Sequence, residues 1–202
     1  MNRRSVLLLL SLGVLAVAAG ALLAHLLGTG VTLQSGTWLP RPRTLAEFHL
    51  QDTSGRDFGV ANLRGHPTLL FFGFTHCPDV CPTTLATLAQ VQRQPPLAGA
   101  QVVFVSVDPE RDTAAALESY LAAFSSGFIG LRGDRAALAP LLRTLNAIAV
   151  RDPLPGGGYT MDHSATLYLL DKHARLVAVF SPPFATDALV ADLRRVEAAR
   201  NL

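Results

Sequence analysis

Two continuous apolar runs joined by a helical stretch place the tightest constraint on the fold of this 202-residue chain. The runs are PTLLFFGF at residues 67–74 and QVVFVSV at residues 101–107. Unbroken apolar runs of this length are typical of strands buried on both faces of a parallel sheet. Between them, Leu85 and Leu88 recur at helical spacing after Pro82, a residue suited to a first helical turn. The pattern predicts a β–α–β crossover.

The flanking segments extend this prediction to a whole domain. Shorter patterns predict a hairpin over 48–58, helices over 112–124 and 134–145, a strand over 128–131, a strand over 147–150 followed by a Pro/Gly loop over 151–158, strands over 164–170 and 175–180, and a closing helix over 186–199. The first half then contains a parallel crossover, and the second half ends in an antiparallel pair and a helix. We therefore predict an α/β fold, a thioredoxin-like sandwich with insertions.

The amino-terminal segment has the composition of a membrane anchor. Residues 6–27 carry no aspartate, glutamate, lysine or arginine, and Arg3 and Arg4 precede them. As a helix this run would be about 33 Å long, enough to cross a bilayer. The arginines favour a cytoplasmic amino terminus. We expect residues 1–28 to be a single-pass anchor in a bacterial inner membrane, with the domain on the periplasmic side. The alternative is a cleaved signal peptide.

Charge and composition bound the rest of the chain. Residues 29–42, rich in Gly, Thr, Ser and Pro, are predicted to be a linker, which leaves residues 43–202 for the domain. The chain has 17 basic and 15 acidic residues, and the excess is accounted for by the two arginines at its start. The neutral body lacks the basic surface that a nucleic-acid partner requires.

The two cysteines of the chain, Cys77 and Cys81, carry the strongest chemical signal. They lie where the first buried strand is expected to pass into a helix, and a helix amino terminus lowers the pKa of a cysteine. Thioredoxin-type oxidoreductases use a Cys-x-x-Cys spacing, whereas here three residues separate the pair. Two thiols one helical turn apart are able either to form a disulfide or to chelate one metal ion.

His163 is the candidate third ligand. It precedes a predicted strand, and in a thioredoxin-like fold the loop before that strand faces the cysteine turn. Thioredoxins place a cis-proline there, whereas this chain has no proline from residue 157 to residue 180. Thiolates combined with imidazole favour copper or zinc. The alternative is a structural histidine that is hydrogen-bonded in a turn.

Several neighbours of these three residues carry side chains that are able to support a metal site. We expect His76 to point away from the cysteines, Asp79 to be a solvated turn residue and Met161 to pack in the domain. Asp108 is expected either to orient the site or to cap a turn, and Asp162 to accept a hydrogen bond from His163 or its loop.

Three separated motifs together resemble the SCO/SenC family of membrane-anchored copper proteins. They are GFTHCPDVCPT at residues 73–83, SVDPERDT at residues 106–113, and DHS at residues 162–164 with YLL following. The resemblance spans residues 45–200. It implies a thioredoxin-like fold and a copper ion, Cu(I) or Cu(II), held by Cys77, Cys81 and His163.

The same resemblance implies a function. It suggests a metallochaperone, not an enzyme, that delivers copper to the dinuclear copper centre of cytochrome c oxidase during assembly. The implied partners are the copper-centre subunit of the oxidase and other copper chaperones or thiol reductants. The alternative is a thiol–disulfide reductase in which Cys77 and Cys81 form the redox pair and His163 is dispensable. A peroxidase would need an arginine beside its cysteine, and neither Thr75 nor His76 supplies that role.

Overall fold

The computed structural model describes residues 12–20, 31–95 and 99–200, and the chain divides into two compact units, residues 1–31 and 32–202. In the first unit residues 12–20 are helical. The rest of the expected anchor over residues 6–27 lies outside the described residues. Among the helices that are described, none combines the length and the apolar character needed to cross a membrane.

The second unit is built on an eight-stranded sheet with the order β1-β10-β9-β4-β5-β6-β2-β3. Strands β4, β5 and β6 run parallel, and the other neighbours pair antiparallel. The predicted crossover is therefore confirmed, as is the antiparallel pair of the second half. The strands are β1 (Gly36–Thr44), β2 (Leu50–Asp52), β3 (Asp57–Phe58), β4 (Thr68–Gly73), β5 (Gln101–Ser106), β6 (Phe128–Arg132), β9 (Leu167–Leu170) and β10 (Arg175–Phe180).

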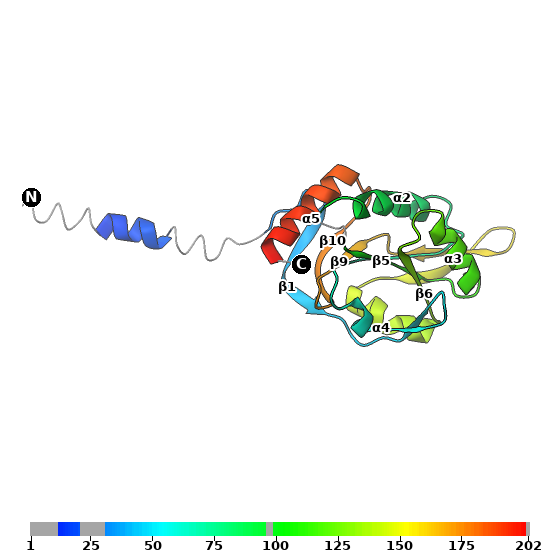
Figure 1. The fold of residues 1–202 in the computed structure, drawn as a ribbon. Helices are drawn as coiled ribbons and strands as arrows, with labels where there is room; N and C mark the ends of the chain where they lie inside the picture. Colours follow the sequence, from blue (N-terminus) through cyan, green and yellow to red (C-terminus); the bar gives the residue numbers. More distant parts are fainter. Residues whose placement is uncertain (1–11, 21–30, 96–98, 201–202) are drawn as a thin grey trace, which may run out of the picture. The chain divides into compact units, whose positions relative to one another are not determined.

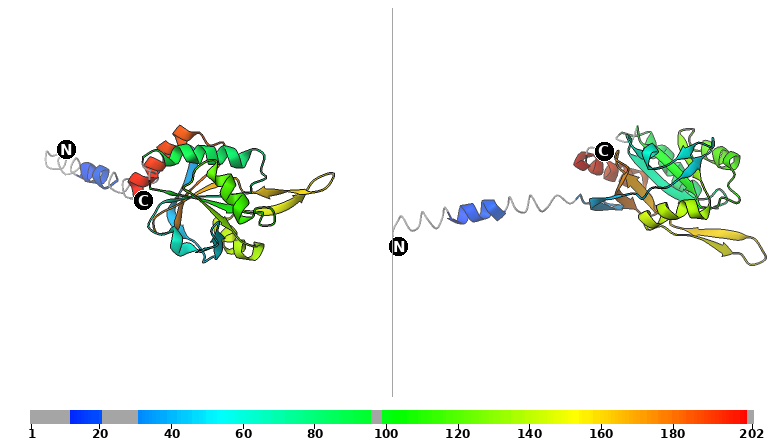
Figure 2. Two further views of the ribbon diagram at one scale, coloured as in Figure 1. Left: turned by 45° about the vertical axis from the view of Figure 1, so that its right-hand side comes forward. Right: turned by 90° about the horizontal axis from the view of Figure 1, so that it is seen from below.

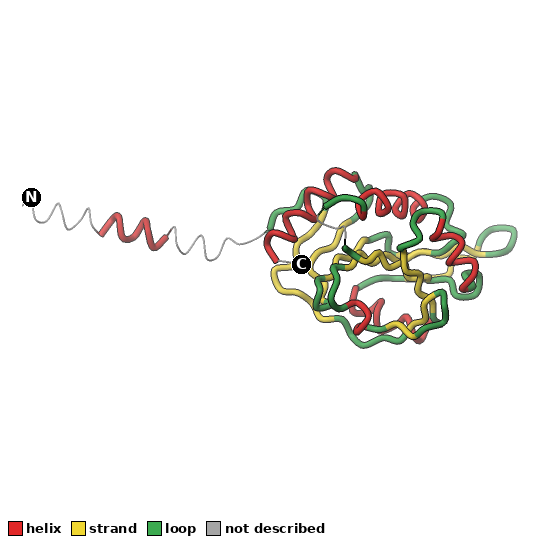
Figure 3. Tube along the Cα trace, in the orientation of Figure 1, coloured by secondary structure: helices red, strands yellow, loops and turns green. Residues whose placement is uncertain are grey.

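Helices cover both faces of this sheet, as Figure 3 shows by colour. Figure 1 places α2 (Val80–Gln92) and α5 (Thr186–Arg200) together on one side and α4 (Arg135–Leu145) on the other. Helix α3 (Ala114–Ala122) packs on β6, and a short 3-10 helix, η1, spans Val60–Leu63. Thr113 and Asp134 cap α3 and α4 by accepting hydrogen bonds from the backbone N–H groups of Ala116 and Ala137.

The core lies between the helices and the central strands. All six residues of β4 are buried, and so are five of the six in β5. Phe71, Phe72 and Phe104 are fully buried within it. Because burial of apolar area is the main favourable term in folding, these two strands fix the position of everything that follows them in the chain. The mixed α/β architecture agrees with the predicted sandwich.

A second, two-stranded sheet was only half predicted. Strands β7 (Ala149–Pro153) and β8 (Tyr159–His163) form an antiparallel hairpin in which Ala149 lies opposite His163. Figure 2 shows this hairpin extending beyond the main sheet. The expected strand over 147–150 continues to Pro153, and the expected loop over 151–158 is in part a strand. The expected strand over 164–170 begins only at Leu167, because residues 159–163 belong to the hairpin.

The predicted linker is wrong from residue 36 onward. Residues 36–44 form β1, which pairs with β10 at one edge of the sheet. Just before it, the buried carboxylate of Asp192 in α5 accepts hydrogen bonds from the backbone N–H groups of Gln34 and Ser35 and from the Ser35 hydroxyl. The packed domain therefore begins before residue 43.

Candidate metal centre

The turn between β4 and α2 presents two free cysteines side by side. Cys77 lies in the turn and is half-buried, whereas Cys81 lies in the first turn of α2 and is fully buried. The Cys77 N–H donates to the carbonyl of Phe74 at 3.2 Å, and the Cys81 N–H donates to the Sγ atom of Cys77 at 3.4 Å. One N–H group of the helix amino terminus, that of Cys81, therefore points at a sulfur atom.

Gly73 makes this packing possible. A Cβ atom at residue 73 would lie 2.6 Å from the Phe104 ring and 2.9 Å from the Sγ atom of Cys81. Both separations are shorter than van der Waals contact, so glycine lets Cys81 sit against the end of β4. The sequence contains a signal of this requirement, because a glycine that ends a buried strand often marks a close approach.

His163 reaches the cysteines from the end of the β7–β8 hairpin. Its Nε2 atom lies 3.6 Å from the Sγ atom of Cys81, and its Nδ1 atom lies 3.2 Å from the carbonyl oxygen of Ser164. Because a carbonyl only accepts, Nδ1 carries the proton of the neutral imidazole. The lone pair of Nε2 then faces the sulfur atoms, which is the state that a metal ligand requires.

Two phenylalanine rings hold the imidazole in place. The ring of Phe74 meets that of His163 edge to face, with centroids 5.7 Å apart and an interplanar angle of 87°. The ring of Phe71 does so at 6.1 Å and 80°. Both phenylalanines belong to β4 or the residue after it, so the strand that leads to the cysteines also orients the histidine.

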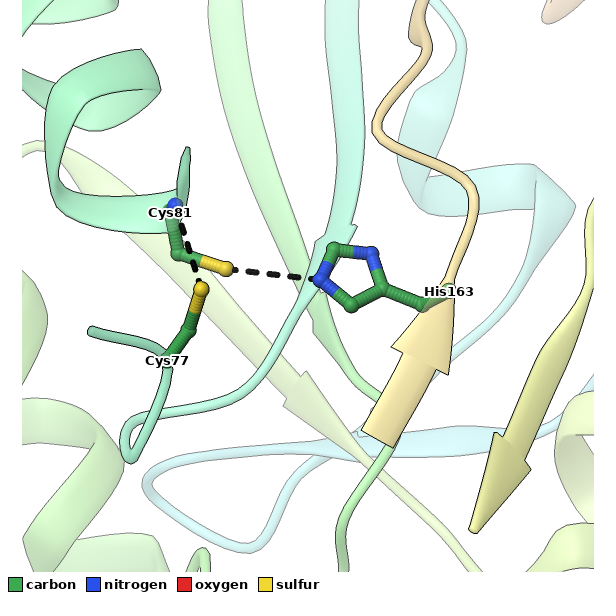
Figure 4. A group of neighbouring side chains, drawn as sticks. All are labelled: Cys77, Cys81 and His163. Atoms are coloured by element: carbon green, nitrogen blue, oxygen red, sulfur yellow. Dashed lines mark hydrogen bonds between the residues drawn. The ribbon is translucent and has the colours of Figure 1, made fainter. Parts of the chain in front are cut away.

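The three candidate ligands form one compact group (Figure 4). The Sγ atoms of Cys77 and Cys81 and a ring nitrogen of His163 lie within 4.8 Å of one another. Metal–sulfur and metal–nitrogen bonds of about 2.3 and 2.0 Å at a trigonal angle put a sulfur and a nitrogen atom about 3.7 Å apart and two sulfur atoms about 4.0 Å apart. The group is therefore close to the size that one soft metal ion needs, and the predicted ligands converge from two distant segments.

Burial sets the ionisation of two of these ligands. Burial of the Cys81 thiol is the largest influence and raises its pKa far above the usual range. Burial also lowers the pKa of His163, against the opposing effect of the hydrogen bond to Ser164. The expected lowering of a cysteine pKa by the helix terminus is therefore wrong for Cys81, because desolvation outweighs it. Cys81 is a weak free nucleophile, and a metal ion bound there would displace the thiol proton to solvent.

The remaining candidates take different places. The Nδ1 atom of exposed His76 contacts the Thr75 hydroxyl at 3.0 Å, and His76 is outside the group of three, as expected. The carbonyl of Ser164, rather than the carboxylate of Asp162, accepts the hydrogen bond from the His163 ring. Asp79 is exposed and accepts from Thr83, and Met161 packs against the core as expected.

Asp112, which stands at the start of the helix predicted over 112–124, supports the cysteine turn. It is fully buried, and its carboxylate accepts hydrogen bonds from the Thr75 N–H at 3.2 Å, the Thr75 hydroxyl at 2.6 Å and the Ser106 hydroxyl at 2.6 Å. Thr75 is two residues from Cys77, so Asp112 fixes the start of the cysteine turn. A buried carboxylate needs such partners, but the sequence does not say which residues supply them.

Comparisons with known proteins agree with the geometry. The family model described as SCO1/SenC matches residues 38–198. A Stutzerimonas stutzeri protein named as a putative copper-binding protein is 36% identical over 154 residues, which cover 75% of this chain and 76% of the relative. The mitochondrial SCO2 homologue of Bos taurus is 37% identical over 158 residues, 76% of this chain and 59% of that protein.

Solved structures give the same result. The structure of Bradyrhizobium japonicum ScoI with copper bound is 40% identical, with a TM-score of 0.67, and the match covers 76% of this chain and 99% of that one. BsSco, described as a member of the Sco family of cytochrome c oxidase assembly proteins, shares the fold at 22% identity with a TM-score of 0.62, over 82% of this chain and 98% of its own.

Proposed function

This chain belongs to the SCO1/SenC family, and on that premise we propose that it is a copper chaperone. Its cargo is a copper ion, Cu(I) or Cu(II), held by Cys77, Cys81 and His163. It delivers this ion to the dinuclear copper centre of cytochrome c oxidase during assembly. The observation that carries the proposal is the convergence of two sulfur atoms and one imidazole nitrogen within 4.8 Å.

The donor set suits a cargo ion that has to leave again. Two thiolates and an imidazole suit copper or zinc, and three ligands leave a position open for an incoming ligand. Cys77 and His163 line a pocket of about 240 Å³, whereas Cys81 is fully buried. A thiol of the partner therefore reaches copper through this pocket and displaces the two half-buried ligands, Cys77 and His163, before Cys81.

The surface around the pocket suits a protein partner. Among the described residues from 32 onward, the large apolar side chains that stay exposed are Val80, Ile148, Val150 and Leu154. Val80 lines the pocket and precedes Cys81 in the chain, and the other three lie in or beside the β7–β8 hairpin that ends at His163. Exposed apolar groups gathered around a site are typical of an interaction surface. The copper-centre subunit of the oxidase is the proposed occupant, with copper chaperones or thiol reductants as the upstream partners.

The proposed setting follows from the amino-terminal sequence. Residues 1–28 serve as a single-pass anchor in the bacterial inner membrane, through the uncharged run at 6–27, with the arginines on the cytoplasmic side. A linker follows, and the copper-binding domain stands on the periplasmic side.

A copper titration tests the proposal. The reduced full chain, titrated with Cu(I) against a competing chelator, should bind one ion. Replacing both cysteines by alanine should abolish this binding, and His163→Ala should weaken it by about 10- to 100-fold. His76→Ala is the matched control, because His76 adjoins Cys77 but lies outside the ligand group. Affinity that is unchanged in the cysteine or His163 variants would rule out the three-ligand site.

The second candidate is a thiol–disulfide reductase that keeps the copper-binding cysteines of the client reduced. The observation in its favour is that the two thiols are free and adjacent. His163 separates the two functions. If His163→Ala cells assemble the oxidase as the parent cells do, while the double-cysteine variant fails, the protein acts as a reductase.

A further inference from the structure

The segment between β5 and α3, residues 107–113, contacts both halves of the metal centre. On one side Asp112 holds Thr75 at the start of the cysteine turn. On the other side Asp108 and Arg111 hold Tyr159, the first residue of β8. His163 lies at the other end of the same strand. One short segment therefore connects the two parts of the chain that carry the candidate ligands.

The contact with Tyr159 is made at three points. The Tyr159 hydroxyl donates to the Asp108 carboxylate at 2.8 Å, and the Arg111 Nη1 group donates to the Tyr159 carbonyl at 3.1 Å. The Arg111 guanidinium also lies over the Tyr159 ring, 4.0 Å from its centroid. Because Asp108 is buried and forms an ion pair with Arg111, the arginine is held rigidly against the ring.

Arg111 also lies near Phe74, one of the two rings that pack against His163. Its guanidinium carbon lies 5.7 Å from the centroid of the Phe74 ring, which meets the His163 ring edge to face. Arg111 thus touches both a residue of the His163 strand and a ring that packs on His163.

One donor group of Arg111, its Nη2 atom, is buried without an acceptor among the described residues, which lowers the stability of the folded domain. A buried unsatisfied donor costs about 1–3 kcal/mol, so such a group calls for an explanation. The need to hold Tyr159 and Phe74 together supplies one.

We propose that Arg111 is a positioning residue that sets the affinity of the metal centre by fixing the β7–β8 hairpin, and with it the Nε2 atom of His163, against the cysteines. This inference rests on the proposed copper function and deepens it. Without Arg111 the hairpin keeps its own pairing, the Tyr159 hydroxyl bond to Asp108 and the Arg151–Glu110 ion pair, but it loses the guanidinium contacts with the Tyr159 carbonyl and ring. His163 then samples positions too far from Cys81 to share one ion.

The test is a double-mutant cycle on the full chain, with Cu(I) as the probe. We expect Arg111→Gln to weaken Cu(I) binding about tenfold. In a His163→Ala background the same substitution should have no further effect, because the ligand that Arg111 positions is absent. Arg151→Gln is the matched control. Arg151 also lies over the Tyr159 ring, at 3.9 Å, but its ion pair with the segment over 107–113 is to exposed Glu110, and an exposed ion pair contributes little to holding two segments together.

A spectroscopic readout separates positioning from a general loss of stability. With Cu(II) bound, the thiolate-to-copper absorption band of Arg111→Gln should shift toward that of His163→Ala. If Arg111→Gln does not fold, Tyr159→Phe removes only the hydroxyl bound to Asp108 and is judged by the same two criteria. Equal losses of affinity in both backgrounds, or no loss in the native background, would overturn the inference. If the native protein binds copper without any dependence on His163, the proposed function fails first.

Discussion

Buried aspartates close both ends of the main sheet, but they do so in different ways. At the end away from the cysteines, Asp52 and Asp171 each accept hydrogen bonds from residues two and four positions further along the chain. At the cysteine end, Asp112 and Asp108 bind residues 37 and 51 positions away. The first kind of contact shapes a turn, and the second joins segments that the chain order keeps apart.

The difference separates stability from site geometry. A local turn stabilises the fold wherever it occurs, and nothing in the metal centre depends on its details. A contact between distant segments determines where those segments lie relative to each other. The distance between the cysteine turn and the His163 hairpin is therefore a property of the segment over 107–113 as much as of the ligands themselves.

The largest expected effect comes from removing one aspartate at each end. Asp112→Ala leaves the Thr75 N–H and the Ser106 hydroxyl without their acceptor, and Asp171→Ala does the same to the Arg175 guanidinium and two backbone N–H groups. Each should lower the free energy of unfolding by about 3 kcal/mol in chemical denaturation. Copper affinity, measured by chelator competition, should fall at least about tenfold in Asp112→Ala only. An equal fall of copper affinity in both variants would contradict the proposed difference between the aspartates at the two ends of the sheet.

A smaller effect is expected from a methyl group added at each end. In Gly73→Ala the new Cβ meets Phe104 and the Cys81 sulfur, so we expect a loss of about 2 kcal/mol in stability together with weaker copper binding. In Gly55→Ala the Cβ meets open space, but the backbone φ is +81°. That variant should lose about 1 kcal/mol and keep its copper affinity. Thermal unfolding and copper titration of the two proteins side by side decide the matter.

The response to pH should also differ between the ends, with the smallest effect of the three. Copper must displace the proton that burial keeps on Cys81. Because one proton is released for each ion bound there, copper affinity should rise by up to about tenfold per pH unit around neutrality. Burial alone would raise the pKa of Asp52, but hydrogen bonds from Ser54 and Arg56 outweigh it and lower the pKa to about 2.

Asp52 affects folding stability rather than copper affinity, and it does so at acid pH rather than around neutrality. A lowered carboxyl pKa stabilises the folded state above the unfolded value of 3.8, and this stability is lost as the pH falls toward about 2. The free energy of unfolding, taken from denaturation curves, should therefore fall below about pH 4 in the native protein, and it should fall less in Asp52→Asn. Copper affinity that is flat between about pH 6 and pH 8 would contradict the first half of this prediction.

The sequence predicts those parts of the fold in which one face, or both, is buried over several residues. Strands β4 and β5 are continuous apolar runs, so their burial is visible in the residue types. The sequence predicts a linker where β1 begins, because that segment is rich in Gly, Thr, Ser and Pro. Pro40 and Pro42 are tolerated in the strand because β1 lies at the edge of the sheet. The far part of the β7–β8 hairpin is exposed on both faces, so its sequence has no alternation to detect.

The sequence predicts the candidate ligands but not the residues that hold them in position. Cysteine and histidine carry distinctive chemistry, so Cys77, Cys81 and His163 stand out in the sequence, and the structure brings them together. That they bind copper stays a proposal. Asp112 and Arg111 look like an ordinary helix start, because their role lies in contacts with residues far away in the chain. No local pattern encodes such contacts.

The Asp192 contact with Gln34 and Ser35 has a mechanical consequence. Tension that enters the domain from residue 34 meets this carboxylate before it reaches β1, and α5 carries the load into the core through its buried face. Strand β1 is thereby protected from being peeled off β10 at the sheet edge. In single-molecule pulling from the amino-terminal side, Asp192→Asn should give way at a lower force than the native domain. The candidate metal centre lies at the carboxyl ends of β4 and β5. Strand β1 and helix α5 take up the force before it reaches that centre.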